Sequence, residues 1–174
     1  MKNKLTILLF LIFSTIALAQ NFHDITIESI TGEELSMSEF KGKYILVVNV
    51  ASRCGYTKQY ADLEKLYQLY DNLVILGVPC NQFANQEPLN EEGILQFCSS
   101  KYNVTFPMTS KVNVKGKDKH PLYQWLTEKD KNKVDDIRIS WNFNKFLVDP
   151  NGKFIKHFGS SIKPLNEEIS SLIK

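Results

Sequence analysis

The sequence has few of the residues that bind metals or form structural disulfides. It contains three cysteines and three histidines among 174 residues. The cysteines, Cys54, Cys80 and Cys98, form no C-x-x-C pair, and the histidines are scattered without the spacing of ligands. We therefore expect no metal site, because a structural zinc site needs closely spaced ligands. The same lack argues against a disulfide exchanger or a copper chaperone, since either would need two neighbouring cysteines.

The sequence also lacks an excess of either charge. Lysine and arginine number 21 and aspartate and glutamate 19, which gives a formal net charge of +2. Lys2 and Lys4 fall in a segment that we expect to be removed, and without them the chain is neutral. A neutral chain without a polybasic run has no basic face for nucleic acid or for an anionic membrane surface. We expect neither as a partner.

Long hydrophobic runs are missing after the N-terminal segment, which reads MKNKLTILLFLIFSTIALAQ. Its two lysines, the apolar run over residues 5–18 and the small residues before Gln20 follow the order of a secretory signal peptide. The run is shorter than the ~20 residues of a spanning helix, so a retained anchor is the less favoured alternative and no stable membrane insertion is expected. We predict a signal peptide over residues 1–19, a single domain over 20–174, and export to the periplasm or the extracellular space.

The mature part has an ordinary composition, without the glycine, proline or glutamine excess of disordered chains. Outside the cytoplasm disulfides can persist, and an odd number of cysteines leaves at least one thiol free or exchanging.

The apolar pattern predicts an α/β fold. The run Tyr44–Val50 is short, β-branched and continuously apolar, as in a strand buried on both faces, and residues 73–78 form a second such run. Between them Thr57 is a candidate cap for a helix with apolar residues at Tyr60, Leu63 and Tyr67. A strand, a helix and a strand in this order predict a parallel pair with a right-handed crossover.

Four further elements are expected downstream. Asn90, followed by two glutamates, is typical of a helix start, and His120-Pro121 opens another helix. The runs over 145–149 and 153–158 predict a hairpin, because a Pro-Asn-Gly turn separates them. A last helix is expected from near Pro164 to the end. We place Ile94, Leu95, Phe97 and Cys98 on the inward side of the first of these helices.

Cys54 is the first candidate for chemistry. It follows a buried strand and precedes a helix, with Arg53 beside it. Its sulfur would therefore face the N-terminal amides of that helix, which favours the thiolate form. The alternative for such a lone cysteine is a small apolar residue packed under a loop.

Three blocks of the sequence then resemble a known family. These are NVASRCGYT over residues 49–57, LGVPCNQF over 76–83 continuing to Gln86-Glu87-Pro88, and Trp141-Asn142-Phe143 leading into 145–149. They are similar to the signature blocks of the glutathione peroxidase family, in a form with cysteine where some members carry selenocysteine. The resemblance implies a thioredoxin-like fold, with a central mixed sheet flanked by helices, and no cofactor.

The resemblance also implies a catalytic tetrad of Cys54, Gln86, Trp141 and Asn142. The chemistry of these side chains agrees, because an indole N–H and two amides can donate hydrogen bonds to a thiolate or to a peroxide oxygen. Gln82 competes with Gln86, and the Gln-Glu-Pro context favours Gln86. The implied reaction is reduction of hydrogen peroxide or of organic and lipid hydroperoxides, with a sulfenic acid on Cys54.

In many cysteine members a second cysteine of the same chain resolves the sulfenic acid. Cys98 occupies that region, and the alternative is a core thiol on a helix face. If Cys98 begins on a packed helix, a disulfide requires that helix to unwind, which predicts a mobile segment around 91–105. Cys80 lies in a block where the family often has a cysteine without a redox role, so we interpret it as structural.

The resemblance favours a thioredoxin-like protein over glutathione as the reductant. It also favours a monomer, because no long insertion separates His120 from Trp141. The alternative function is a peroxide-sensing thiol switch that relays oxidation to a partner protein.

Overall fold

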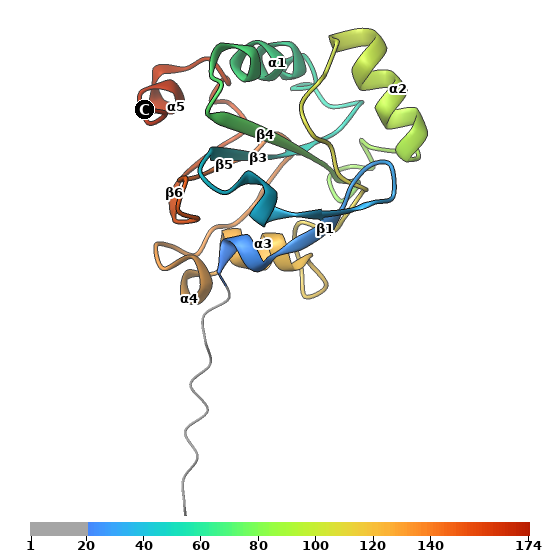
Figure 1. Cartoon of the computed structure of the whole chain (residues 1–174). Coiled ribbons are helices and arrows are strands. Elements are labelled where there is room, and N and C mark those ends of the chain that lie inside the picture. Colours follow the sequence, from blue (N-terminus) through green and yellow to red (C-terminus); the bar gives the residue numbers. More distant parts are fainter. Residues whose placement is uncertain (1–20) are drawn as a thin grey trace, which may run out of the picture.

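A four-stranded mixed sheet forms the centre of the fold, in the strand order β4-β3-β5-β6 (Figure 1). The computed structural model describes residues 21–174, so the predicted signal peptide lies outside the described residues. Strands β3 and β4 are parallel, whereas β3 and β5, and β5 and β6, are antiparallel. The strands are β3 (Tyr44–Val50), β4 (Leu73–Pro79), β5 (Lys145–Val148) and β6 (Phe154–Phe158).

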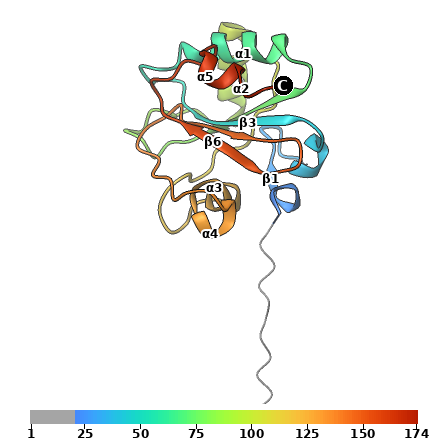
Figure 2. The ribbon, with the colours of Figure 1, turned by 90° about the vertical axis from the view of Figure 1, so that its left-hand side faces the viewer.

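Helices cover both faces of this sheet, as Figures 1 and 2 show. On one face lie α1 (Gln59–Leu69), α2 (Glu91–Tyr102) and the short α5 (Glu167–Ser170). On the other lie α3 (Pro121–Thr127) and α4 (Lys129–Asn132). Each layer has its own hydrophobic core, one around Tyr60, Ile94 and Ile169 and one around Phe22 and Trp125. The sheet is therefore buried on both sides, which explains the continuous apolar runs of β3 and β4.

The N-terminal part adds a small antiparallel pair that the sequence did not predict. It comprises β1 (Thr26–Glu28) and β2 (Glu34–Ser36), flanked by the 3-10 turns η1 (Phe22–Asp24) and η2 (Met37–Phe40). Each strand has three residues, and only Ile27 among them is fully buried. Such short strands leave no alternating run to detect.

The predicted strands are confirmed, and two helix boundaries are corrected. The second strand runs one residue further than predicted, to Pro79. Thr57 does not cap α1, because Lys58 occupies the N-cap position without a side-chain hydrogen bond. The last helix does not begin near Pro164 but after Asn166, whose side chain accepts from the Glu168 amide, and it has only four residues.

The other predicted elements are present, with one burial error. The Asn90 side chain caps α2, as predicted, by accepting from the Gly93 amide. The β5–β6 hairpin and α3 are also confirmed. Leu95, however, does not face inward, and 41% of it is exposed. Ile94 and Cys98, which are four residues apart, occupy the buried face instead.

The described part of the chain, residues 21–174, contains no helix that is long and apolar enough to span a membrane.

Candidate active site

The sheet topology brings three loops to one edge. Parallel strands β3 and β4 end at the same edge, and their loops carry Cys54 and Gln86. Strand β5 runs in the opposite direction, with Lys145 paired to Val48 near the end of β3. The turn that precedes β5 therefore also lies at this edge. It carries Trp141 and Asn142.

The loop after β3 holds Cys54 in a defined backbone conformation. The Cys54 amide donates to the Thr57 hydroxyl oxygen at 2.9 Å, and that hydroxyl donates to the Ala51 carbonyl at 2.8 Å. The Cys54 sulfur accepts a hydrogen bond from the Tyr56 amide at 3.4 Å. This donor lies in the turn before α1 rather than in the helix itself. The sulfur is a free thiol, and 9% of the residue is exposed.

The loop after β4 places Gln86 beside Cys54's loop and Asn142. Ala84 and Asn85 both adopt left-handed backbone conformations, with φ of 52°, and so turn the chain sharply before Gln86. The Gln86 carbonyl accepts from the Arg53 amide at 2.9 Å, which joins the two loops directly. The Gln86 side-chain oxygen accepts from the Asn142 side-chain amide at 3.0 Å. The amide group of Gln86 is then its remaining donor.

The turn before β5 presents one buried and one exposed side chain. Asn142 is fully buried, and within residues 21–174 its side-chain oxygen has no hydrogen-bond partner. Trp141 is 37% exposed and its ring lies 6.1 Å from that of Phe83. In this part of the chain neither residue donates a hydrogen bond to the sulfur of Cys54. The structure thus brings Gln86 and Asn142 into contact and leaves Trp141 partly exposed at the surface.

A buried carboxylate that sequence reasoning missed links the Cys54 and Gln86 loops. Glu87 is fully buried, and its two oxygens accept from the Ser52 amide at 2.8 Å and the Ser52 hydroxyl at 2.7 Å. Burial raises the pKa of Glu87, and the two hydrogen bonds from Ser52 offset this only in part. The glutamate of the Gln-Glu-Pro block was the available signal.

Cys98 lies in the middle of α2 and belongs to the same hydrophobic core as Cys54. It is 1% exposed and a free thiol. Burial raises its pKa to about 11, although the nearby Tyr60 hydroxyl acts in the opposite direction. That hydroxyl has no conventional hydrogen-bond partner within residues 21–174. In the described state Cys98 is therefore a protonated core thiol.

Two other candidates lie outside the site. The Gln82 side-chain oxygen accepts from the amides of Val114 and Lys115, so this glutamine holds a neighbouring loop. Cys80 is fully buried, its sulfur accepts from the Gln82 amide at 3.4 Å, and burial raises its pKa. The contacts of both are those of residues that maintain structure.

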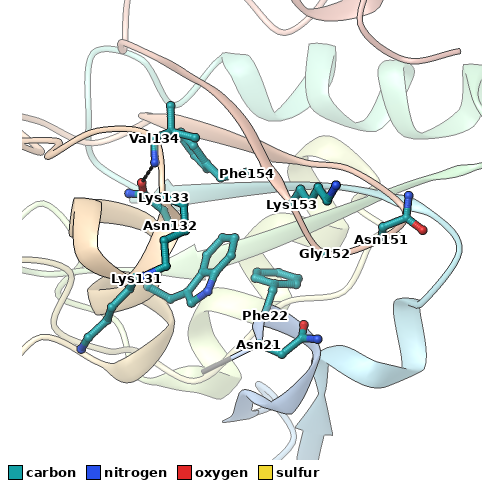
Figure 3. Close-up of a pocket in the computed structure, with 11 residues that line it drawn as sticks. Asn21, Phe22, Lys131, Asn132, Lys133, Val134, Asn151, Gly152, Lys153 and Phe154 are labelled. Carbon is teal, nitrogen blue, oxygen red and sulfur yellow. Dashed lines mark hydrogen bonds between the residues drawn. The ribbon is translucent and has the colours of Figure 1, made fainter. Parts of the chain in front are cut away.

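A cavity of about 290 Å³ is lined by Gly55 and Tyr56, the two residues that follow Cys54 in the chain, together with Lys58 and Lys163. Another, of about 480 Å³, lies at the opposite end of the sheet, near the β5–β6 turn (Figure 3). Two of its polar side chains already have partners within the protein. Lys131 donates to Gln124 and forms an ion pair with Glu128, and Asn132 accepts from the Val134 amide. Residues 21–174 contain no cluster of side chains able to hold a metal ion.

Comparisons with known proteins identify the family of the chain. The family model for glutathione peroxidase matches residues 22–127. The chain is 46% identical over 157 residues to a glutathione peroxidase of Lactococcus lactis subsp. cremoris, covering 88% of this chain and 99% of that protein. It is 45% identical over 157 residues to the glutathione peroxidase-like peroxiredoxin 2 of Saccharomyces cerevisiae, covering 88% and 97%.

Solved structures agree as well. The crystal structure of Trgpx in apo form superimposes with a TM-score of 0.69 at 38% identity, covering 88% of this chain and 95% of that one. The fold is also that of the thioredoxin domain of a thiol-disulfide oxidoreductase from Bacteroides vulgatus, with a TM-score of 0.55 at 17% identity, covering 92% and 100%. The thioredoxin-like fold is thus confirmed, and the chain belongs to the glutathione peroxidase family.

Proposed function

We propose that the protein is a thiol peroxidase that reduces hydroperoxides with Cys54 as the nucleophile. The observation that carries this proposal is the hydrogen-bonded pair of Gln86 and Asn142, in a chain of the glutathione peroxidase family. A backbone hydrogen bond from Arg53 to Gln86 joins this pair to the Cys54 loop. The names of the relatives, glutathione peroxidase and peroxiredoxin, are those of peroxidases. No feature of the site calls for the alternative of a thiol switch.

The first step uses the thiolate of Cys54. It attacks the terminal oxygen of the hydroperoxide, the O–O bond breaks, and the departing oxygen takes a proton to leave as water or an alcohol. The sulfur is oxidised to a sulfenic acid. Amide N–H groups of Gln86 and Asn142 and the indole N–H of Trp141 are the available donors for the negative charge that develops on the departing oxygen.

The second step, in our proposal, joins Cys98 to Cys54. The Cys98 thiol attacks the sulfenic sulfur, a disulfide forms and water leaves. Cys98 lies inside α2 and is 1% exposed, and we propose that this helix unwinds to bring the two Cα atoms within the ~7 Å that a disulfide requires. Unwinding also removes the burial that raises the Cys98 pKa to about 11, so the same movement delivers the thiol and increases its thiolate fraction.

The remaining parts of the proposal concern the donor, the assembly and the compartment. A thioredoxin-like dithiol is the expected reductant of an intramolecular disulfide, and glutathione is the alternative. We propose a monomer that is exported by the segment 1–19. Size-exclusion chromatography and N-terminal sequencing of the secreted protein test these two points.

The test is the intact mass of the mature protein, wild type and Cys98→Ser, before and after one equivalent of hydrogen peroxide. The wild type is expected to lose two hydrogens, and the Cys98→Ser variant to gain one oxygen. Turnover is then measured with NADPH and either thioredoxin and its reductase or glutathione and its reductase.

Cys80→Ser is the matched control, because Cys80 is a buried cysteine outside the site. It is expected to behave as the wild type in both measurements. Oxygen gain by the wild type, with no internal disulfide, would remove Cys98 from the mechanism. Absence of any reaction in the wild type, or an unchanged reaction in Cys54→Ser, would overturn the peroxidase proposal itself.

A further inference from the structure

The turn that carries Trp141 and Asn142 is held by side chains at each of its carbonyl groups. The Trp141 carbonyl accepts from the side-chain amides of Asn49 at 3.1 Å and Asn144 at 2.7 Å. The next carbonyl, of Asn142, accepts from the Ser160 hydroxyl at 2.6 Å. The Phe143 carbonyl accepts from the Lys145 ammonium or amine nitrogen at 2.8 Å. The three consecutive carbonyls thus accept hydrogen bonds from side chains of β3, of β5 and the residue before it, and of the loop after β6.

This turn needs external support because its backbone is strained. Phe143 has a φ of 62°, in the left-handed region that costs a non-glycine residue roughly 1–2 kcal/mol. Such a conformation persists where the surroundings over-determine it. The Phe143 amide adds a further constraint, since it donates to the Asn49 carbonyl at 2.6 Å.

Lys145 is the unusual member of this set. It is fully buried, and no carboxylate of residues 21–174 forms an ion pair with it. Its side-chain nitrogen donates to the Phe143 carbonyl. Burying a lysine without a counter-charge costs free energy, and an apolar side chain of similar length would fill the space at lower cost. Its stability contribution therefore does not explain why a lysine stands here.

The position of Lys145 points to the site. It is the first residue of β5, three residues after Asn142. Its nitrogen reaches back to the carbonyl that directly follows Asn142 in the chain. The Asn142 side chain, which is fully buried and bonded to Gln86, has its direction fixed by this backbone. We therefore expect a change at the Phe143 carbonyl to alter the orientation of Asn142 first, because Asn142 is the preceding residue in the chain.

We propose that Lys145 is a positioning residue, which holds the Phe143 carbonyl so that Asn142 and Trp141 keep the orientation required for attack on the peroxide. This inference rests on the proposed peroxidase function. A misplacement of about 1 Å at a reacting group costs on the order of 100-fold in rate, so the hold has a measurable effect.

The test compares Lys145→Met, which is one atom shorter than lysine and has no donor, with Lys145→Gln, which has the same length as methionine and carries a neutral N–H donor at its end. The rate constant for oxidation of the reduced protein by hydrogen peroxide is measured by quenched flow and intact mass. Lys145→Met is expected to react about 10- to 100-fold more slowly than the wild type, and Lys145→Gln to recover most of this loss. Indole emission should shift in Lys145→Met, because Trp141 moves.

Thr127→Val is the matched control, since Thr127 is a buried donor whose hydroxyl holds the Tyr123 carbonyl at 2.5 Å, away from this turn. It should leave the rate constant unchanged. Thermal unfolding of each variant identifies a loss of fold, and rates are compared well below the midpoint.

Three outcomes would overturn the inference: a Lys145→Met variant that reacts at the wild-type rate, a loss of stability with unchanged rate and emission, and a Lys145→Gln variant as slow as Lys145→Met. If the wild type itself does not react with peroxide, the proposed function fails, whatever the Lys145 variants do.

Discussion

The burial of Lys145 predicts a specific dependence of stability on pH. Burial lowers the pKa of this lysine from 10.5 to about 7, because the charged form is disfavoured away from water. In the unfolded chain the pKa returns to its ordinary value. Between the two values the unfolded chain binds one more proton than the folded protein, so the free energy of unfolding rises with pH. Below about pH 7 both states are protonated and the full cost of burial remains.

The magnitude follows from the size of the shift. Each pH unit between the two pKa values contributes about 1.4 kcal/mol. From pH 7.5 to 9.5 the wild type should therefore gain about 2–3 kcal/mol relative to Lys145→Met, in which this group is missing. At pH 7 the variant should be at least as stable as the wild type, because methionine fills the space without a buried amine.

The assay is urea unfolding of wild type and Lys145→Met under reducing conditions, followed by circular dichroism at several pH values. The difference between the two proteins isolates Lys145, since other groups titrate in both. His157, whose pKa is lowered by burial and by Lys145, is neutral throughout this range. Lys156→Met serves as the control, because Lys156 is half exposed and paired with Glu168. Parallel stability curves for wild type and Lys145→Met would refute the reasoning.

Two further predictions concern the loops of the site. Gln86 and Asn142 share a hydrogen bond of 3.0 Å, and we expect Gln86→Ala and Asn142→Ala each to slow oxidation by peroxide by roughly 10²–10³-fold. The rate of the double variant should fall by less than the product of the two single effects, because each substitution already breaks the shared hydrogen bond. A fall equal to that product, measured by quenched flow, would show that the pair does not act as a unit. Glu87→Gln should lower the free energy of unfolding by about 1–3 kcal/mol, because one of the two oxygens that accept from Ser52 becomes an amide donor; a change below about 0.5 kcal/mol in urea unfolding would contradict this.

The sequence predicted the centre of the fold better than its margins. Strands β3 and β4 were predicted because burial on both faces requires continuous apolar runs. The β1–β2 pair was missed because each strand has three residues, and the last helix was overextended because apolar spacing alone does not show where a helix begins. Leu95 was misplaced since the boundary of the buried face depends on neighbours that are distant in sequence.

The site was predictable only where its residues fall in recognisable blocks. Cys54, Gln86, Trp141 and Asn142 came from such blocks, and the structure brings their loops to one edge. The support of Trp141 and Asn142 was not predicted, because it depends on contacts such as Asn49 to Trp141, which are 92 residues apart. One signal was available: a polar asparagine in the otherwise apolar β3 has to find buried partners.

Strand β3 has a consequence for the mechanical behaviour of the site. Cys54 follows this strand by four residues, and Asn49 within it holds both the carbonyl of Trp141 and the amide of Phe143. Cys54 and the turn that carries Trp141 and Asn142 are thus both attached to the same strand. Bending or twisting of the sheet carries both together, so their separation is insensitive to whole-domain vibration.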